Sequence, residues 1–305
     1  MKESLVLESP AKVNLRLEIL RKREDGYHEL KTIFQKISLN DTLHFSLKKS
    51  KGISITTNHP DLPLGKTNLV YRAAHSILRK SNYKGGVAIQ VEKRIPLGAG
   101  LGGGSSNAAT TLKALNQLLE TNLSRNELME LGLEIGADVP FFLLKGAALG
   151  LGIGERLKKI IVSDLWFVLI YPNLEVSTKW AYQNFDKSLS EPTQSRLQPS
   201  SRKAQRLANQ RFHINLDKFL KTPEGVSQIL FNHLEAVVSK EYPQIDVMKK
   251  MLFAAGAVGA LMTGSGPTVF GLFPGERVAT KAYEKIERLA SRRGWAALKA
   301  HSVTA

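Results

Sequence analysis

The sequence predicts an α+β protein of two domains, and three observations lead to this fold class. Strand and helix patterns interleave through about residue 150, and a second mixed set of patterns begins near residue 160. A length of 305 residues also suits two domains that each bury a core. We therefore predict an N-terminal domain over residues 1–158 and a C-terminal domain over residues 159–305.

The N-terminal domain is predicted to combine half-buried strands with three helices. Four segments alternate apolar and polar residues in the manner of strands: 13–19, 43–47, 53–57 and 87–92. Apolar residues at helical spacing predict helices over 68–79 and 108–119, the second of them capped by Ser105 or Ser106. A third helix is expected after Ser124, because a glutamate three residues later completes a capping box.

The C-terminal domain is predicted to alternate strands and helices around a long polar segment. We expect strands over 165–171, 257–262, 268–273 and 295–303, and helices over 225–239, 243–255 and 279–292. Residues 186–215 are polar and rich in Ser, Gln and Arg, which predicts an exposed excursion. The alternating glycines of 146–155 indicate a strand with close backbone packing rather than a second phosphate site.

The composition excludes several classes of protein and site. The chain has no cysteine, which excludes disulfides, zinc thiolates, iron–sulfur clusters and thiol nucleophiles, and its seven histidines show no metal-ligand spacing. The longest apolar stretches, 165–171 and 252–262, are shorter than the about 20 residues that span a bilayer. The first residues lack the apolar core of a secretory signal. We therefore expect a cytoplasmic protein with no membrane partner.

The net charge raises a different interpretation, a nucleic-acid-binding protein. Its value is +16, from 43 Lys and Arg against 27 Asp and Glu. This is roughly one excess positive charge in twenty residues, which an ordinary basic surface accommodates. The basic residues of 187–221 keep the alternative open, and a steep fall of RNA affinity with salt would be its signature. We do not expect nucleic acid to be the main partner.

Residues 96–107 are the strongest candidate for a binding site. Their sequence, Pro-Leu-Gly-Ala-Gly-Leu-Gly-Gly-Gly-Ser-Ser-Asn, puts five glycines between a predicted strand and a predicted helix. The backbone can therefore approach a ligand closely and direct its N–H groups at a phosphate. A flexible turn with a plain helix cap is the simpler alternative. Gly98, Gly100 and Gly103 also have the dinucleotide-binding spacing, but no strand–helix–strand frame accompanies them.

Five segments together resemble a known family. Residues 9–14 (Ser-Pro-Ala-Lys-Val-Asn), the glycine loop 96–107 and residues 262–270 (Met-Thr-Gly-Ser-Gly-Pro-Thr-Val-Phe) resemble the three signature motifs of the GHMP kinases, in the same order. Residues 25–30 and 136–142 resemble one branch of that superfamily, the 4-diphosphocytidyl-2-C-methyl-D-erythritol kinases of non-mevalonate isoprenoid biosynthesis. The resemblance covers nearly the whole chain.

The resemblance implies both a fold and an activity. It implies an N-terminal ribosomal-protein-like domain with a left-handed βαβ unit, against the usual right-handed rule, and a ferredoxin-like C-terminal domain. It also implies transfer of the γ-phosphate of ATP to the 2-hydroxyl of an acceptor that carries a cytidine diphosphate group. Mg²⁺ is expected with ATP, and Ser105 and Ser106 are candidate ligands without an assignment. Mevalonate, homoserine or a sugar remains an alternative acceptor, and the chain is expected to be a monomer or a weak homodimer.

The resemblance also implies roles for individual residues. Strand periodicity places Lys12 and Asn14 on one strand face, and the resemblance makes Lys12 and Asp138 the catalytic pair; a surface lysine and a turn or capping aspartate are the plain alternatives. The implied ATP-binding residues are Pro96, Leu97, Gly98, Ala99, Gly100, Leu101, Gly102, Gly103, Gly104, Ser105, Ser106 and Asn107. The implied acceptor-binding residues are Asn14, Tyr27, His28, Tyr182, Gly264 and Ser265, with the aromatic residues around the cytosine.

Overall fold

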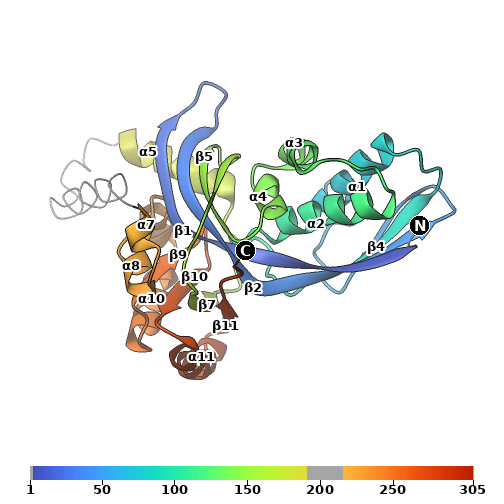
Figure 1. The fold of residues 1–305 in the computed structure, drawn as a ribbon. Helices are drawn as coiled ribbons and strands as arrows, with labels where there is room; N and C mark the ends of the chain where they lie inside the picture. Colours follow the sequence, from blue (N-terminus) through green and yellow to red (C-terminus); the bar gives the residue numbers. More distant parts are fainter. Residues whose placement is uncertain (1–2, 191–215, 305) are drawn as a thin grey trace.

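Two β-sheets and the helices that cover them make up the part of the chain that the structure describes. The computed structural model describes residues 3–190 and 216–304. Most of the predicted excursion over 186–215 lies outside these residues, and its first five residues are helical rather than irregular. A helical lobe extends to one side of the larger sheet, and the smaller sheet packs at the other end (Figure 1).

The larger sheet has seven strands and is organised around two long ones. The strands are β1 (Ser4–Lys22), β2 (His28–Lys48), β3 (Gly52–Thr57), β4 (Gly86–Glu92), β5 (Ala147–Gly152), β6 (Arg156–Ile160) and β8 (Phe231–Asn232). Their order is β3-β4-β2-β1-β8, and β5 pairs with both β2 and β6. β3 and β4 are parallel neighbours joined through a helix, as expected for the βαβ unit. The predicted strand over 146–155 is confirmed as β5.

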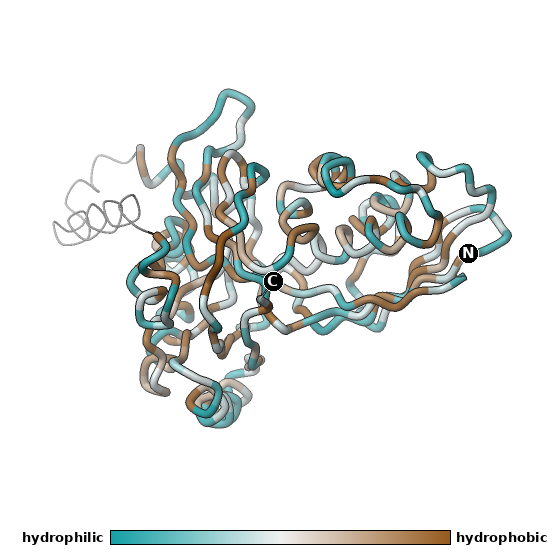
Figure 2. Tube along the Cα trace, viewed as in Figure 1, coloured by the Kyte–Doolittle hydropathy of each residue, from teal (hydrophilic) through white to brown (hydrophobic). Residues whose placement is uncertain are grey.

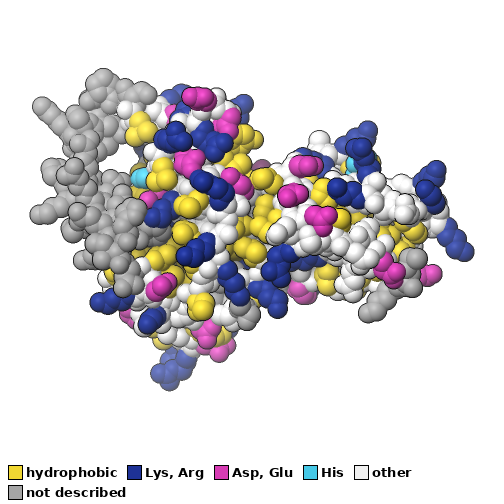
Figure 3. Space-filling model, turned by 45° about the horizontal axis from the view of Figure 1, so that its top comes forward, with side chains coloured by type: hydrophobic (Ala, Val, Ile, Leu, Met, Phe, Trp, Pro, Cys, Tyr) yellow, Lys and Arg dark blue, Asp and Glu magenta, His cyan; other side chains and the backbone are white. Residues whose placement is uncertain are grey.

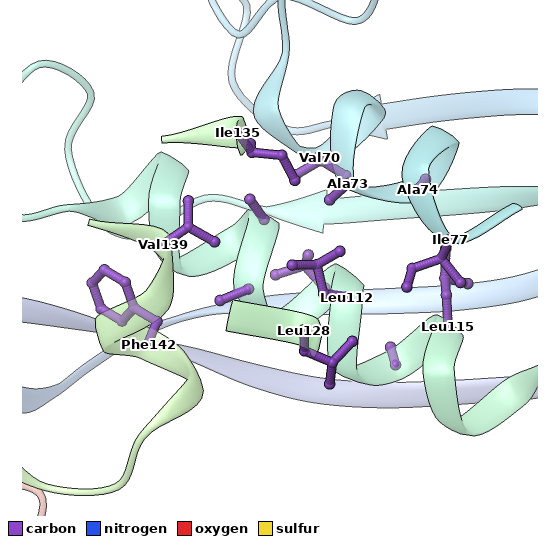
Figure 4. Packing of buried hydrophobic residues seen from close by; sticks show 14 of the residues in the cluster. Val70, Ala73, Ala74, Ile77, Leu112, Leu115, Leu128, Ile135, Val139 and Phe142 are labelled. Carbon is purple, nitrogen blue, oxygen red and sulfur yellow. The ribbon is translucent and has the colours of Figure 1, made fainter. Parts of the chain in front are cut away.

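Four helices form the lobe beside this sheet: α1 (Leu69–Lys80), α2 (Gly103–Leu118), α3 (Arg125–Ile135) and α4 (Val139–Leu143). Their apolar faces meet in one buried cluster, in which Ile77, Leu115 and Phe142 are almost fully buried (Figure 4). The capping box at Ser124 is confirmed. The predicted cap of α2 is wrong, because Gly102 is its N-cap and Ser105 and Ser106 lie inside the first turn.

The smaller sheet has four antiparallel strands: β7 (Trp166–Tyr171), β9 (Gly259–Met262), β10 (Val269–Phe273) and β11 (Ala296–His301). Their order, β11-β7-β10-β9, with helices after the first and third strands, is the ferredoxin-like arrangement that the resemblance implies. The described residues of this half form the helices α5 (Thr178–Ser190), α7 (Leu216–Phe219), α8 (Pro223–Ser227), α9 (Glu235–Glu241), α10 (Gln244–Ala254) and α11 (Glu276–Ser291).

One predicted helix is wrong. Residues 225–239 are divided among α8, the short strand β8 and α9. β8 pairs in parallel with β1 of the larger sheet, at Arg16 and Leu17. This long-range pairing overrides the helical pattern of the local sequence. It also ties the C-terminal part of the chain directly to the first strand.

β1 is more buried than its alternating sequence predicts. Ala11, Val13 and Leu15 are fully buried against the apolar face of the smaller sheet. The polar side chains on the opposite face, Lys12 and Asn14, are also almost fully buried. The expectation of a half-buried strand is therefore wrong, because protein covers both faces. Figure 2 shows hydrophobic residues along the strands and hydrophilic residues in the outer loops.

A buried carboxylate anchors the chain just before the glycine loop. Asp41 is fully buried on β2, and its Oδ1 accepts hydrogen bonds from the backbone N–H groups of Arg94 (2.8 Å) and Ile95 (2.9 Å). Its Oδ2 accepts from Nδ2 of Asn107 at 2.9 Å and forms an ion pair with the buried Nζ of Lys93. This carboxylate therefore joins the strand before the loop to the helix after it.

We expect Asp41→Ala to lower the free energy of unfolding by about 3–5 kcal/mol, because it leaves the Lys93 charge buried without its partner. Urea denaturation of the purified protein measures this change. Asp25→Ala is the matched control, since Asp25 pairs with Arg23 at the surface, where an ion pair contributes about 0–1 kcal/mol. Equal effects of the two substitutions would contradict the proposed anchor.

Candidate active site

A cleft of about 950 Å³ lies where the predicted motifs meet. The predicted site residues that line it are Lys12, Asn14, Tyr27, His28, residues 96–105, Asp138, Tyr182, Gly264 and Ser265. The predicted residues that do not line it are Ser106 and Asn107, which are buried below the loop. Segments far apart in the sequence are thus brought together around a single space.

The ammonium group of Lys12 lies at the centre of these segments. Lys12 is 4% exposed, so the alternative of a surface lysine is wrong. Its Nζ donates hydrogen bonds to Oδ1 of Asn14 at 2.7 Å and to the carbonyl oxygen of Gly100 at 2.8 Å. Oδ2 of Asp138 lies 3.8 Å from the same nitrogen. Burial lowers the pKa of Lys12, and the charge of Asp138 opposes this shift.

The carboxylate of Asp138 is available to a ligand. Asp138 occupies the N-cap position of α4, but its side chain makes no capping hydrogen bond. The side chain is 34% exposed and lines the cleft. The alternative role of a plain helix cap therefore does not account for this residue. A carboxylate beside an ammonium can accept or orient the proton of a hydroxyl group.

The glycine loop closes around Lys12 and leaves no room for a side chain at Gly100 or Gly102. Gly100 and Gly102 both have left-handed backbones, with φ of 74° and 70°. A Cβ on Gly100 would lie 2.4 Å from the carbonyl oxygen of Thr263, and one on Gly102 would lie 3.1 Å from Cε of Lys12. No side chain caps the start of α2, and its first residues, Gly103 and Gly104, line the cleft. This geometry suits a phosphate group.

The end of the glycine loop has a structural role. Oγ of Ser9 donates to Oγ of Ser106 at 2.8 Å, and Nδ2 of Asn107 donates to Oγ of Ser9 at 2.9 Å. Together with Asp41, these buried groups fix the first turn of α2 under the cleft. The first motif therefore supports the loop through Ser9 as well as through Lys12.

The loop after β9 covers Lys12 from the smaller sheet. The backbone N–H of Asn14 donates to Oγ1 of Thr263 at 2.9 Å, and a Cβ on Gly264 would lie 3.3 Å from Nζ of Lys12. Nδ2 of Asn232 donates to the carbonyl oxygens of Met262 and Gly264, each at 2.8 Å. Sequence reasoning missed Asn232, because it placed this residue inside a predicted helix.

The aromatic side chains of Tyr27, His28 and Tyr182 also line the cleft, and we call them the aromatic end. The rings of His28 and Tyr182 stack with centroids 4.9 Å apart, and Tyr27 is 60% exposed beside them. Burial, with a smaller contribution from Asp138, raises the pKa of Tyr182. Nε2 of His28 lies 2.7 Å from Oδ1 of Asp186. Sequence reasoning missed Asp186, because this residue opens the segment predicted to be an excursion.

The residues that the structure describes include no cluster of three or more His, Cys, Asp or Glu side chains that could hold a metal ion. Over the same residues, no helix is long and apolar enough to span a membrane. Lys and Arg side chains are interspersed with acidic ones on the face shown in Figure 3. The cleft thus combines a glycine loop, a buried ammonium, an available carboxylate and aromatic side chains.

Comparison with known proteins agrees with this geometry. The family model of the GHMP kinase N-terminal domain matches residues 68–146, and that of the GHMP kinase C-terminal domain matches residues 216–291. A 4-diphosphocytidyl-2-C-methyl-D-erythritol kinase from Citrifermentans bemidjiense is 42% identical over 99% of this chain and 100% of its own length. One from Syntrophus aciditrophicus is 46% identical over 91% of this chain and 93% of its own.

Solved structures give the same result. A crystal structure of 4-(cytidine 5'-diphospho)-2C-methyl-D-erythritol kinase superposes with a TM-score of 0.77 and 35% identity, and the match covers 99% of this chain and 100% of that one. A homoserine kinase from Cytophaga hutchinsonii, at 22% identity and a TM-score of 0.75 over 100% of this chain and 96% of its own, shares the fold. The predicted fold class is confirmed. The chain belongs to the GHMP kinases and, within them, to the 4-diphosphocytidyl-2-C-methyl-D-erythritol kinases.

Proposed function

We propose that this protein transfers the γ-phosphate of ATP to the 2-hydroxyl of 4-diphosphocytidyl-2-C-methyl-D-erythritol, giving the 2-phosphate and ADP, in non-mevalonate isoprenoid biosynthesis. The observation that carries the proposal is the Lys12–Asp138 pair, whose Nζ and Oδ2 lie 3.8 Å apart in the cleft that the glycine loop and the aromatic residues also line. Relatives named for this acceptor align over nearly the whole chain. The phosphate donor and the acceptor alcohol would meet at this pair.

Lys12 and Asp138 would act on the attacking hydroxyl. The carboxylate of Asp138 accepts or orients the hydroxyl proton, and the Lys12 ammonium stabilises the carboxylate and the charge that develops on the transferred phosphoryl group. Phosphoryl transfer passes through a loose transition state, so positioning and electrostatics contribute at least as much as proton removal. The hydrogen bonds from Lys12 to Asn14 and Gly100 fix its ammonium for this role.

The glycine loop would hold the nucleotide phosphates. The N–H groups of residues 98–104 and the start of α2 bind the phosphate oxygens, and Ser105 contributes a hydroxyl at the cleft. Mg²⁺ would accompany ATP and would supply positive charge to its phosphates. Since Oγ of Ser106 is bonded to Ser9, the residues that fit a contact with the ion are Ser105 and Asp138.

The aromatic end would bind the cytosine of the acceptor. Tyr27, His28 and Tyr182 line the cleft and offer ring faces and a polar imidazole edge. Asp186, bonded to Nε2 of His28, would orient that imidazole. Asn14, Gly264 and Ser265 also line the cleft, and Asn14 binds Nζ of Lys12, so these residues would contact the methylerythritol group.

The direct test measures ADP release with Mg-ATP and 4-diphosphocytidyl-2-C-methyl-D-erythritol. A parallel assay uses the acceptor that lacks the cytidyl group. We expect turnover with the cytidylated acceptor and a new phosphomonoester signal in the phosphorus NMR spectrum. Absence of turnover by folded, ATP-binding protein would overturn the acceptor assignment. Absence of ATP binding, together with salt-dependent binding of RNA, would favour the nucleic-acid alternative instead.

Asp138→Asn is expected to lower kcat by about 10²–10⁴-fold, the usual contribution of a general base, with little change in either KM. The amide keeps the size of the side chain but loses its charge, and steady-state kinetics measures the effect. Asp164→Asn is the matched control, because Asp164 is exposed and lies outside the cleft. A decrease of kcat that is equal in both variants would refute the role of Asp138.

Tyr182→Ala is expected to raise the KM for the cytidylated acceptor by about 5–150-fold, since stacking contributes about 1–3 kcal/mol per base. The KM for ATP should stay unchanged, because the glycine loop is not affected. Tyr83→Ala is the control, since Tyr83 lies outside the cleft and bonds the Lys48 carbonyl oxygen. An unchanged acceptor KM in Tyr182→Ala would remove this residue from the cytosine site.

A further inference from the structure

Two lysine side chains from different elements meet at the C-terminal end of α4. Nζ of Lys36, on β2, donates a hydrogen bond to the carbonyl oxygen of Phe142 at 3.0 Å and bonds the carbonyl oxygen of Leu144 as well. Nζ of Lys113, on α2, donates to the same Phe142 oxygen at 2.7 Å. We call these two ammonium groups and the two carbonyl oxygens the carbonyl clamp.

The carbonyl clamp binds a helix that is too short to be stable by itself. α4 has five residues, and isolated helices this short are unstable in water. Its side chains Val139, Phe141 and Phe142 are buried, so that the helix is fixed by its surroundings (Figure 4). The last carbonyl groups of a helix have no partner within the helix, and cations are favoured there. The carbonyl clamp provides hydrogen-bond donors from β2 and α2 for the carbonyl oxygens of Phe142 and of the C-cap residue Leu144.

The helix links the carbonyl clamp to the catalytic centre. Asp138 is the N-cap of α4 and Phe142 lies one turn further on, a separation of about 6 Å at about 1.5 Å per residue. The carboxylate of Asp138 has no capping bond that would fix it locally. A shift of the C-terminal end of α4 would therefore move this carboxylate and change its distance from Nζ of Lys12.

We propose that Lys36 and Lys113 are positioning residues, which hold the carboxylate of Asp138 beside Lys12 by binding the last carbonyl groups of α4. They touch neither nucleotide nor acceptor, since neither side chain lines the cleft. The inference rests on the proposed function, because it assigns Asp138 to the transfer step. It adds the contacts that would align the carboxylate of Asp138 for the phosphoryl transfer.

The surroundings of the carbonyl clamp are cationic. Lys113 faces Lys36, Arg125 faces Lys113, and Lys12 is the cross-strand neighbour of Lys36. Burial, and then the neighbouring charge of Lys113, lowers the pKa of Lys36 to about 7. Burial and Arg125 lower the pKa of Lys113 to about 8. Loss of these protons weakens the bonds to the carbonyl oxygens, because a charged donor is about twice as strong as a neutral one.

Stability and activity should therefore respond to pH in opposite directions. Between these folded-state pKa values and the unfolded value of 10.5, the unfolded chain binds more protons than the folded one. The free energy of unfolding from these two groups accordingly rises with pH over this window. The carbonyl clamp weakens over the same window. A purely structural role would make activity follow stability.

The first test is Lys113→Met, which keeps most of the length of the side chain and removes the charge. We expect kcat to fall by about 10–100-fold, in line with the loss of about 10²-fold that a misplacement of about 1 Å can cause, while both KM values stay within the error of the measurement. Lys36→Met should act in the same direction. The control is Lys285→Met, since Lys285 makes the same kind of bond, to the last carbonyl oxygen of α10, away from the cleft.

A second measurement separates positioning from folding. Lys113→Arg keeps its charge at all relevant pH values, so the ratio of its kcat to that of the unmodified protein should rise between about pH 7 and pH 9. Titration of Lys12 affects both proteins and cancels in the ratio. The proposal would be overturned if Lys113→Met kept the kcat of the unmodified protein, or if its loss of kcat only matched the fraction of unfolded protein. A ratio of kcat values that does not change with pH would overturn it as well. Failure of the unmodified protein to turn over would instead refute the proposed function.

Discussion

The buried ammonium of Lys12 is the constraint on which the rest of the site depends. A charge taken out of water is costly unless hydrogen bonds and an opposite charge surround it. Lys12 obtains them from Asn14 on its own strand, from Gly100 in the glycine loop and from Asp138 at the start of α4. Three segments of the chain must therefore converge on one nitrogen atom. Burial of both faces of β1 makes that convergence possible.

Each convergent segment is fixed by a polar group behind it. Asp41 binds the chain before the glycine loop, and Asn232 binds the carbonyl oxygens of Met262 and Gly264 at the start of the loop after β9. The carbonyl clamp holds the helix that carries Asp138. These groups are largely buried and make hydrogen bonds that a ligand would not need to supply. The reacting groups can therefore be ordered before the substrates bind, which is how a site lowers a barrier by orientation.

The fold was predictable where the local pattern and the tertiary structure agree. The apolar spacing of 68–79 and the capping box at Ser124 gave α1 and α3, because both signals are local. The helix predicted over 225–239 was wrong, because β8 pairs with a strand more than two hundred residues away. The cap predicted for α2 was wrong because Gly102, in a left-handed conformation, begins the helix earlier. Sequence periodicity contains no signal for either effect.

The sequence by itself determined which chemical groups are expected in the site, since the five motifs contain the glycine loop, Lys12, Asp138, Tyr27 and His28. Their common place in one cleft agrees with that prediction. Only the tertiary structure decided which polar residues support them. Asp41, Asn232, Asp186 and the carbonyl clamp act through contacts between distant segments, and no spacing along the chain encodes such contacts. A motif specifies groups that meet a ligand, whereas the burial that orients those groups is a property of the folded chain.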